Sequence, residues 1–203
     1  MMMDVITTGF STVDTLRRRN LGLAIHAHRA MHGFITRDNS EGIHGKGKLN
    51  GFSISMIVLA KLFRLLGVDS IHGGSPLSKM EDYNEAIYIK KILQEKNLFP
   101  DKKIPSLGQN WYHIKPVWMT ASGGLHPGDF EVILDTLGSD IIIQCGGGVL
   151  GHPKGIKAGV IAAQQARDIY YKKIKIKDFV KKEDCSELSD AVREWGFGPR
   201  IVY

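Results

Sequence analysis

Short apolar runs that end in small or polar residues alternate along this chain with longer segments of helical periodicity. The runs are rich in β-branched residues and are bounded by glycine, which is typical of buried parallel strands. They cover residues 21–26, 68–74, 117–124 and 140–148. The pattern therefore predicts four strands whose carboxyl ends carry histidine, serine and glycine.

The segments between these runs place apolar side chains on one face of a helix. They cover residues 54–66, 81–95, 130–137 and 157–171. Gly67 is a suitable residue to end the first of them. We expect two further helices, one that starts at residues 11–14 with a capping side chain and one over 186–195. A strand followed by a helix, four times over, predicts an α/β fold with parallel strands, either a small open sheet or half of a closed eight-stranded barrel.

Composition places the chain among globular proteins. Its 203 residues suit one domain, and 43% of them are apolar and 24% charged. No apolar stretch approaches the roughly 20 residues of a membrane helix, and residues 1–4 lack the basic character of a secretory signal. Two cysteines, Cys145 and Cys185, are too few for a disulfide framework. We therefore expect a cytoplasmic protein without a membrane partner.

The net charge of +6 raises the question of a nucleic-acid partner. Much of the excess lies in residues 172–182, where lysine alternates with isoleucine and acidic residues follow. That alternation indicates a solvated face over a buried one. We expect no nucleic-acid partner, and affinity for phosphorylated small molecules is the better explanation of the charge.

Candidate chemistry lies at the ends of the first two predicted strands. His26 and His28 would share one face of a strand and could bind a metal ion, although a strand cap with hydrogen-bonded rings explains them as well. Arg29 beside them favours an anion, because a guanidinium matches the geometry of phosphate. Lys79 follows His72 in a segment of small residues and could reach a bound substrate from a mobile loop, or be a solvated lysine.

Glycine runs follow the last two predicted strands, at 122–124 and 146–148. Glycine lets backbone N–H groups approach an anion closely, and barrels often bind phosphate after their last two strands. Together with the arginine and histidines of the preceding strands, these runs predict a phosphorylated ligand. Cys145 has no base beside it in the sequence and is interpreted as a core thiol.

Four motifs, in order, resemble the large chain of ribulose-bisphosphate carboxylase/oxygenase (RuBisCO), and the intervening sequence is most similar to the archaeal form III enzymes. The motifs are His26–His32, Ile71–Gly74 with Lys79, Ala121–His126 and Gln144–Pro153. The resemblance implies a partial TIM (β/α)8 barrel, from roughly strand 4 or 5, near residues 4–10, to strand 8 and the carboxyl-terminal helices. Residues 1–203 would then be the carboxyl-terminal portion of the catalytic barrel domain, without the amino-terminal domain and strands 1–3.

The resemblance also implies roles for individual residues. His28 resembles the histidine that accepts a proton, and Lys79 the loop lysine that stabilises the carboxylation transition state. Ser75 and Ser78 stand where the family usually has threonine and glycine in this loop. The residues that resemble substrate ligands are Arg29, His32, His72, Ser122, Gly123, Gly124, Gln144, Gly146 and Gly147.

The implied activity is the addition of CO2 to ribulose 1,5-bisphosphate and cleavage to two 3-phosphoglycerates, in form III enzymes within AMP salvage. The family's Mg²⁺ is bound by residues of the part that this chain lacks, so no metal ligand is expected here. The chain alone should be inactive until a complementary amino-terminal large-chain portion completes it, and a homo-oligomer is expected.

Three alternatives stay open. The chain could be a RuBisCO-like enolase or isomerase of a related sugar phosphate, although Lys79 and the pair of Arg29 and His72 speak against it. It could be a catalytically dead phosphate-binding module. A metal-dependent hydrolase built on His26 and His28 is the third alternative.

Overall fold

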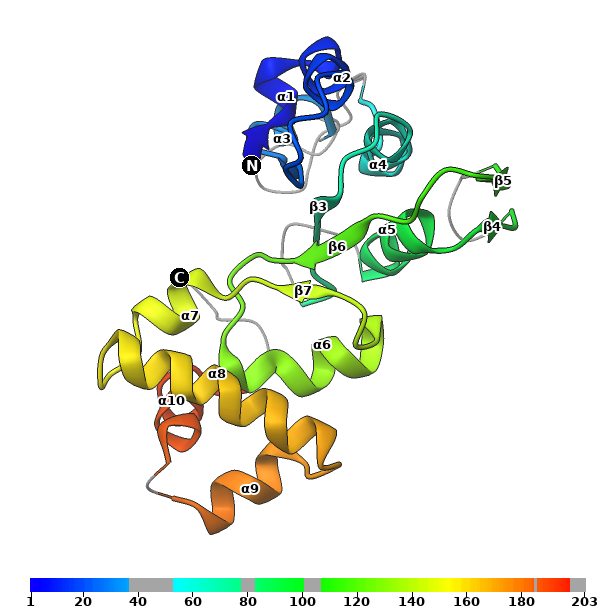
Figure 1. Cartoon of the computed structure of the whole chain (residues 1–203). Helices are drawn as coiled ribbons and strands as arrows, with labels where there is room; N and C mark the ends of the chain where they lie inside the picture. The colour runs from blue at the N-terminus through cyan, green and yellow to red at the C-terminus, as the bar shows by residue number, and fades with distance from the viewer. Residues whose placement is uncertain (37–52, 78–82, 101–106, 185, 198–203) are drawn as a thin grey trace, which may run out of the picture. The chain divides into compact units, whose positions relative to one another are not determined.

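The computed structural model of the chain consists of two compact units (Figure 1). The structure describes residues 1–36, 53–77, 83–100, 107–184 and 186–197. The first unit lies within residues 1–73 and 88–119, and the second within residues 74–87 and 120–203.

Parallel strands form the framework of the first unit. In spatial order they are β1 (Met2–Asp4), β2 (His26–His28), the main part of β3 (Ser70–Gly74) and the first residues of β6 (Trp118–Ala121). Parallel pairing sets Asp4 opposite His28, and His26 opposite Ser70. These strands and their helices confirm the predicted α/β class, and the position of β3 agrees closely with the predicted run.

The other strand boundaries correct the prediction. The first strand was expected over residues 21–26, but β2 begins only at His26. The reason is burial: Leu21 and Leu23 are 54% and 57% exposed, so this apolar run does not enter the core. Near residues 4–10 only β1 is a strand, and helices follow from Val5 onward. The histidines of β2 therefore lie within the strand and not after it.

Helices and one antiparallel hairpin complete the described part of the first unit, with α5 shared between the units. They are α1 (Val5–Thr8), α2 (Phe10–Arg18), α3 (Gly33–Thr36), α4 (Met56–Leu65), α5 (Tyr83–Gln94), β4 (Asn97–Leu98) and β5 (Gln109–Asn110). The predicted stop after α4 is confirmed, because Gly67 has a φ of 79°, which favours glycine. Every helix in the described ranges is too short or too polar to cross a bilayer.

The expected side-chain cap at residues 11–14 is wrong. Helix α2 begins at Phe10, with Gly9 as its N-cap and no capping side chain. Thr12 lies inside the helix, where its Oγ1 donates to the carbonyl of Thr8 at 2.7 Å. A hydroxyl that bonds back to the preceding turn is compatible with a helix interior as well as with a cap, so the sequence pattern was ambiguous.

A buried arginine that the sequence pattern did not single out links elements of the first unit. The guanidinium of Arg64, on α4, donates to the carbonyls of Glu95 at 2.9 Å and Lys115 at 3.1 Å. It also lies 4.3 Å from the ring centre of Trp111. Burial lowers the pKa of Arg64 to about 10. Arg64 thus satisfies loop carbonyls that would otherwise be unpaired in the interior.

The second unit combines a short parallel pair with a helical layer. The end of β6 pairs with β7 (Ile142–Ile143), with Thr120 opposite Ile142. Most of the predicted strand 140–148 is therefore not a strand, and its glycines begin a helix. The helical elements are η1 (Pro127–Asp129), α6 (Phe130–Leu137), α7 (Gly146–Leu150), α8 (Ile156–Tyr171), α9 (Ile176–Lys182) and α10 (Glu187–Trp195). Helix α8 packs against α6, α7, α9 and α10, around a core that includes Leu134 and Leu188.

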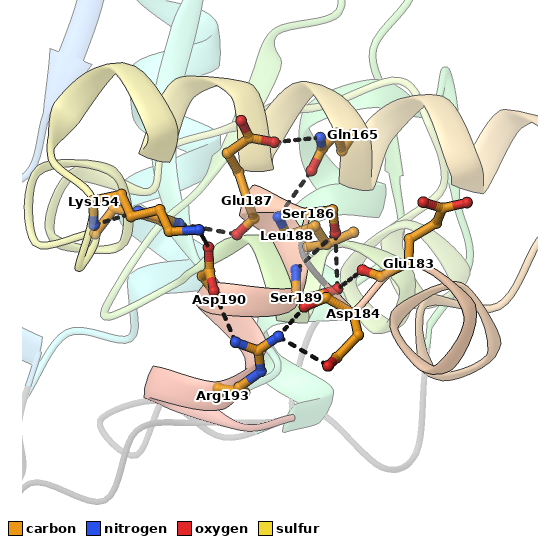
Figure 2. Close-up of polar contacts among 11 residues, drawn as sticks. Lys154, Gln165, Glu183, Asp184, Ser186, Glu187, Leu188, Ser189, Asp190 and Arg193 are labelled. Carbon is orange, nitrogen blue, oxygen red and sulfur yellow. Dashed lines mark hydrogen bonds and ion pairs between the residues drawn. The ribbon is translucent and has the colours of Figure 1, made fainter.

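Polar contacts fix α10 in the second unit (Figure 2). Ser186 caps the helix by accepting from the N–H of Ser189, as the predicted start at 186 implies. The carboxylate of Asp190 pairs with Lys154 at 2.5 Å and with Arg193 at 2.9 Å. Gln165, on α8, accepts from the backbone N–H of Leu188 at 2.8 Å. These groups satisfy one another, which is typical of a structural network.

Candidate active site

Three histidine rings meet in the first unit, and we call His26, His28 and His72 the histidine cluster. His26 and His28 are two residues apart on β2, so their side chains share one face of the strand. Both face His72 on β3, with ring centres 4.8 Å and 5.0 Å from its own in edge-to-face geometry. The predicted shared face is thus confirmed.

A residue of a neighbouring strand holds one nitrogen of each β2 ring. Nδ1 of His28 lies 2.5 Å from Oδ1 of Asp4 on β1. Nδ1 of His26 lies 2.8 Å from Oγ of Ser70 on β3. Each partner stands directly opposite its histidine in the parallel register. Neither Asp4 nor Ser70 was predicted as a site residue, because the pairing depends on strand register. The one signal in the sequence for Asp4 was an acidic residue 24 positions before His28.

Burial and neighbouring positive charges keep His72 neutral. Its side chain is 6% exposed, and burial first, then His26, His28 and Arg29, lowers its pKa to about 4. Burial and His28 also lower the pKa of His26. At neutral pH His72 is therefore a hydrogen-bonding group without charge, and it can donate to an anion through one ring nitrogen.

The cationic member of this region is Arg29, which directly follows β2 and is 8% exposed. Beyond it, Met31 adopts a left-handed φ of 65°, and the chain turns into α3. Nδ1 of His32 lies 3.0 Å from Oγ1 of Thr36 on α3. The charge of Arg29 is among the causes that lower the pKa of His72, so Arg29 lies close enough to His72 to act on it electrostatically.

In the second unit most of the predicted substrate residues are glycines, which can contact a ligand only through their backbone. Ser122 donates its N–H to the carbonyl of Gly74 at 3.2 Å, which continues the end of β6. Gly123 and Gly124 follow with φ of 112° and 72°, a conformation that favours glycine. Both are exposed, as is Gln144 after β7. The N–H of Gln144 donates to the carbonyl of Ala121 at 2.9 Å, whereas a Cβ added to Gly124 would meet no atom within 4 Å, so the glycines offer the backbone that suits an anion.

The glycines of α7 have two different environments. A Cβ added to Gly146 or Gly147 would meet no atom within 4 Å, so both positions are open. A Cβ on Gly148 would lie 2.5 Å from the carbonyl oxygen of Leu125 and from Cα of His126. Gly148 therefore permits a close approach of two chain segments, whereas Gly146 and Gly147 present the first turn of α7, whose N–H groups have no partner within the helix.

The loop residues of the second motif and the two cysteines differ in whether the structure describes them. Lys79 and Ser78 lie outside the described residues, as does Cys185. Cys145 is partly buried, and burial raises the pKa of its thiol, as expected for a core thiol.

No group of three or more His, Cys, Asp or Glu side chains in the described ranges is arranged to hold a metal ion. His26 and His28 have ring and hydrogen-bond partners there instead of a third ligand. These imidazoles do not suit Mg²⁺, which prefers oxygen ligands, and the resemblance places the family's Mg²⁺ ligands among residues other than these.

Known proteins resemble the chain over almost its whole length. Residues 1–195 match the family of the ribulose bisphosphate carboxylase large chain, catalytic domain. The ribulose bisphosphate carboxylases of Thermococcus onnurineus and Archaeoglobus fulgidus are 41% and 40% identical over 96% of the chain, which covers 42% of each relative.

Solved structures agree with these relatives. The dimeric archaeal Rubisco of Hyperthermus butylicus is similar with a TM-score of 0.82 and 36% identity, over 97% of this chain and 43% of that one. The octameric Rubisco of Pyrococcus horikoshii is similar with a TM-score of 0.76 and 36% identity, over 96% and 41%. The chain thus spans about two fifths of the length of these relatives. Its match to the family over residues 1–195 means that the chain belongs to the RuBisCO large-chain family.

Proposed function

We propose that this chain is the carboxyl-terminal part of the catalytic barrel of a ribulose bisphosphate carboxylase. Completed by an amino-terminal large-chain portion, it adds CO2 and water to ribulose 1,5-bisphosphate and releases two 3-phosphoglycerates. The observation that carries the proposal is the proximity of His28 and His72 on neighbouring parallel strands, with Arg29 directly after β2, in a chain that matches the family over residues 1–195.

The chemistry of these groups suits the proposed roles. The planar guanidinium of Arg29 can bind one phosphate through paired hydrogen bonds and its positive charge. His72, which is neutral, can add a hydrogen bond to that phosphate without adding charge. His28, partly exposed beside them, can exchange a proton with a bound sugar. His32 completes this group of substrate residues.

The remaining roles fall on Lys79 and on the second unit. An ammonium at Lys79 would stabilise negative charge as CO2 adds. Ser122, Gly123 and Gly124, with Gln144, Gly146 and Gly147, would bind the other phosphate through backbone N–H and polar groups. The support for this half is the two open glycine positions of α7 and the left-handed glycines after β6.

The proposal is tested by mixing. The chain is combined with the amino-terminal part of an archaeal form III large chain, Mg²⁺, bicarbonate and ribulose bisphosphate, and 3-phosphoglycerate is measured. We expect product that disappears with Lys79→Ala and persists with Lys177→Ala, a matched substitution of an exposed lysine on α9.

Other outcomes would identify other functions. Assembly that binds bisphosphate without product would indicate a phosphate-binding module, and rearranged substrate without carboxylation would indicate an isomerase. Since relatives are dimeric and octameric, we expect the active mixture to elute as a homo-oligomer of completed chains. In the cytoplasm, a nucleotide-salvage reaction that yields ribulose bisphosphate would supply such an enzyme.

A further inference from the structure

We propose that Asp4 is a positioning residue that fixes the proton of the His28 imidazole on Nδ1 and leaves Nε2 as its basic nitrogen. The inference rests on the proposed function only in so far as His28 exchanges a proton with the substrate. It concerns a contact between β1 and β2 inside the first unit, where both residues are described.

The hydrogen bond between Asp4 and His28 determines which imidazole nitrogen of His28 carries the proton. Asp4 and His28 stand directly opposite each other on parallel strands, and Oδ1 lies 2.5 Å from Nδ1. An ionised carboxylate only accepts hydrogen bonds, so Nδ1 must donate. A neutral imidazole that carries its proton on Nδ1 has its lone pair on Nε2. The contact therefore selects one tautomer.

The Asp4 carboxylate does not cap the helix that follows it. Asp4 occupies the N-cap position of α1, where an aspartate commonly accepts from the first helical N–H groups, yet its side chain makes no capping bond. Its backbone is held instead, because Oγ1 of Thr7 and Oγ1 of Thr8 donate to the Asp4 carbonyl at 3.1 Å and 2.9 Å. The carboxylate is thus directed to His28 from an anchored backbone.

The partners of His26 and His28 differ in whether they determine the tautomer of the imidazole. His26 has the same relation to Ser70 that His28 has to Asp4, with Nδ1 at 2.8 Å from the hydroxyl oxygen. A hydroxyl donates as well as accepts, so Ser70 leaves the tautomer of His26 open. Of the two histidines on β2, it is His28 whose partner dictates where its proton lies. Ser70→Ala is therefore a matched control for a substitution of Asp4.

The direct test is the tautomer itself. Long-range ¹H–¹⁵N NMR of the imidazoles in the full chain, at a pH where His28 is neutral, should show the proton on Nδ1 of His28. Asp4→Asn, which can donate to Nδ1, should shift the population toward the other tautomer, whereas Ser70→Ala should leave the His28 signals unchanged. A wild-type His28 with its proton on Nε2 would overturn the proposal without recourse to any variant.

The second readout is catalysis in the completed enzyme. A general base contributes about 10²–10⁴-fold, so Asp4→Asn should lower kcat by about 10- to 100-fold with the KM for bisphosphate nearly unchanged. Asp4→Glu should recover part of the loss, because it restores a carboxylate, and circular dichroism should show that the variants remain folded. An unchanged kcat in Asp4→Asn would contradict the proposal. An Asp4-dependent tautomer in a mixture that makes no product would instead contradict the proposed function and leave the positioning role intact.

Discussion

The candidate site residues of the first unit differ in kind from those of the second unit. In the first, the residues act through side chains: the rings of the histidine cluster contact one another across β2 and β3, and Arg29 beside them lowers the pKa of His72. In the second, the corresponding residues are mostly glycines, which offer backbone N–H groups and free space. Removal of a site side chain in the first unit should therefore lower activity more than stability. In the second unit, a Cβ added to a glycine should change stability or ligand binding, depending on the space around it.

The largest effect is expected for His28→Ala in the completed enzyme. Removal of a proton-transfer group should lower kcat by about 10²–10⁴-fold. The free energy of unfolding should change little, because the side chain of His28 is 38% exposed. His113→Ala, at an exposed histidine of the first unit, is the control for a histidine substitution. Steady-state kinetics and urea unfolding measure the two quantities, and a parallel loss of both would contradict the separation between chemistry and folding.

The second effect is a difference in stability between alanine substitutions at two neighbouring glycines of α7. Gly148→Ala should lower the free energy of unfolding by roughly 2–3 kcal/mol, because its Cβ would meet the backbone of Leu125 and His126 at 2.5 Å. Gly147→Ala has open space and should instead stabilise α7 by up to about 1 kcal/mol. It should nevertheless weaken bisphosphate binding in the mixture, since the Cβ occupies space that the ligand would use. Urea unfolding and ligand titration of both variants distinguish the two environments, and equal stabilities would refute the contrast.

These two predictions differ in how far the sequence alone could support them. The motifs placed His28 and the glycine runs at strand ends, and periodicity located β3, α4 and α6 well, because their apolar faces are buried as the pattern implies. Periodicity failed for β2, because the apolar run of residues 21–26 includes the exposed Leu21 and Leu23 and ends at His26, where the strand begins.

What the sequence could not give is register. The pairing of Asp4 with His28 joins residues 24 positions apart, and it depends on how β1 slides along β2. The difference between Gly147 and Gly148 likewise depends on where α7 meets the segment after β6. Both are tertiary facts, and no local pattern encodes them.

The third effect is a dependence of stability on pH in the first unit, caused by the lowered pKa of His72. The pKa of His72 falls from 6.5 to about 4 in the folded chain, first because of burial and then because of its cationic neighbours. Between these pH values the unfolded chain takes up a proton at this residue that the folded chain does not. The free energy of unfolding should therefore fall by about 3 kcal/mol as the pH drops through this window. His72→Asn should flatten that part of the profile, and an unchanged slope in urea unfolding at stepped pH would refute the assignment.

The smallest effect tests whether side chains of the second unit serve stability instead of chemistry. Asp190→Asn removes the carboxylate charge from its pairs with Lys154 and Arg193, whose side chains are 59% and 52% exposed and return readily to solvent. A loss of about 1 kcal/mol is expected at pH 7, with kcat of the completed enzyme unchanged. The hydrogen bond from Lys154 lowers the pKa of Asp190 below 3.8, so its contribution is present above that pH and is lost as the pH falls further. The wild type and the variant should therefore converge in stability only as the pH falls through this lowered pKa, and a difference in urea unfolding that does not shrink as the pH is stepped down from 3.8 would show that the contribution of Asp190 is not its charge.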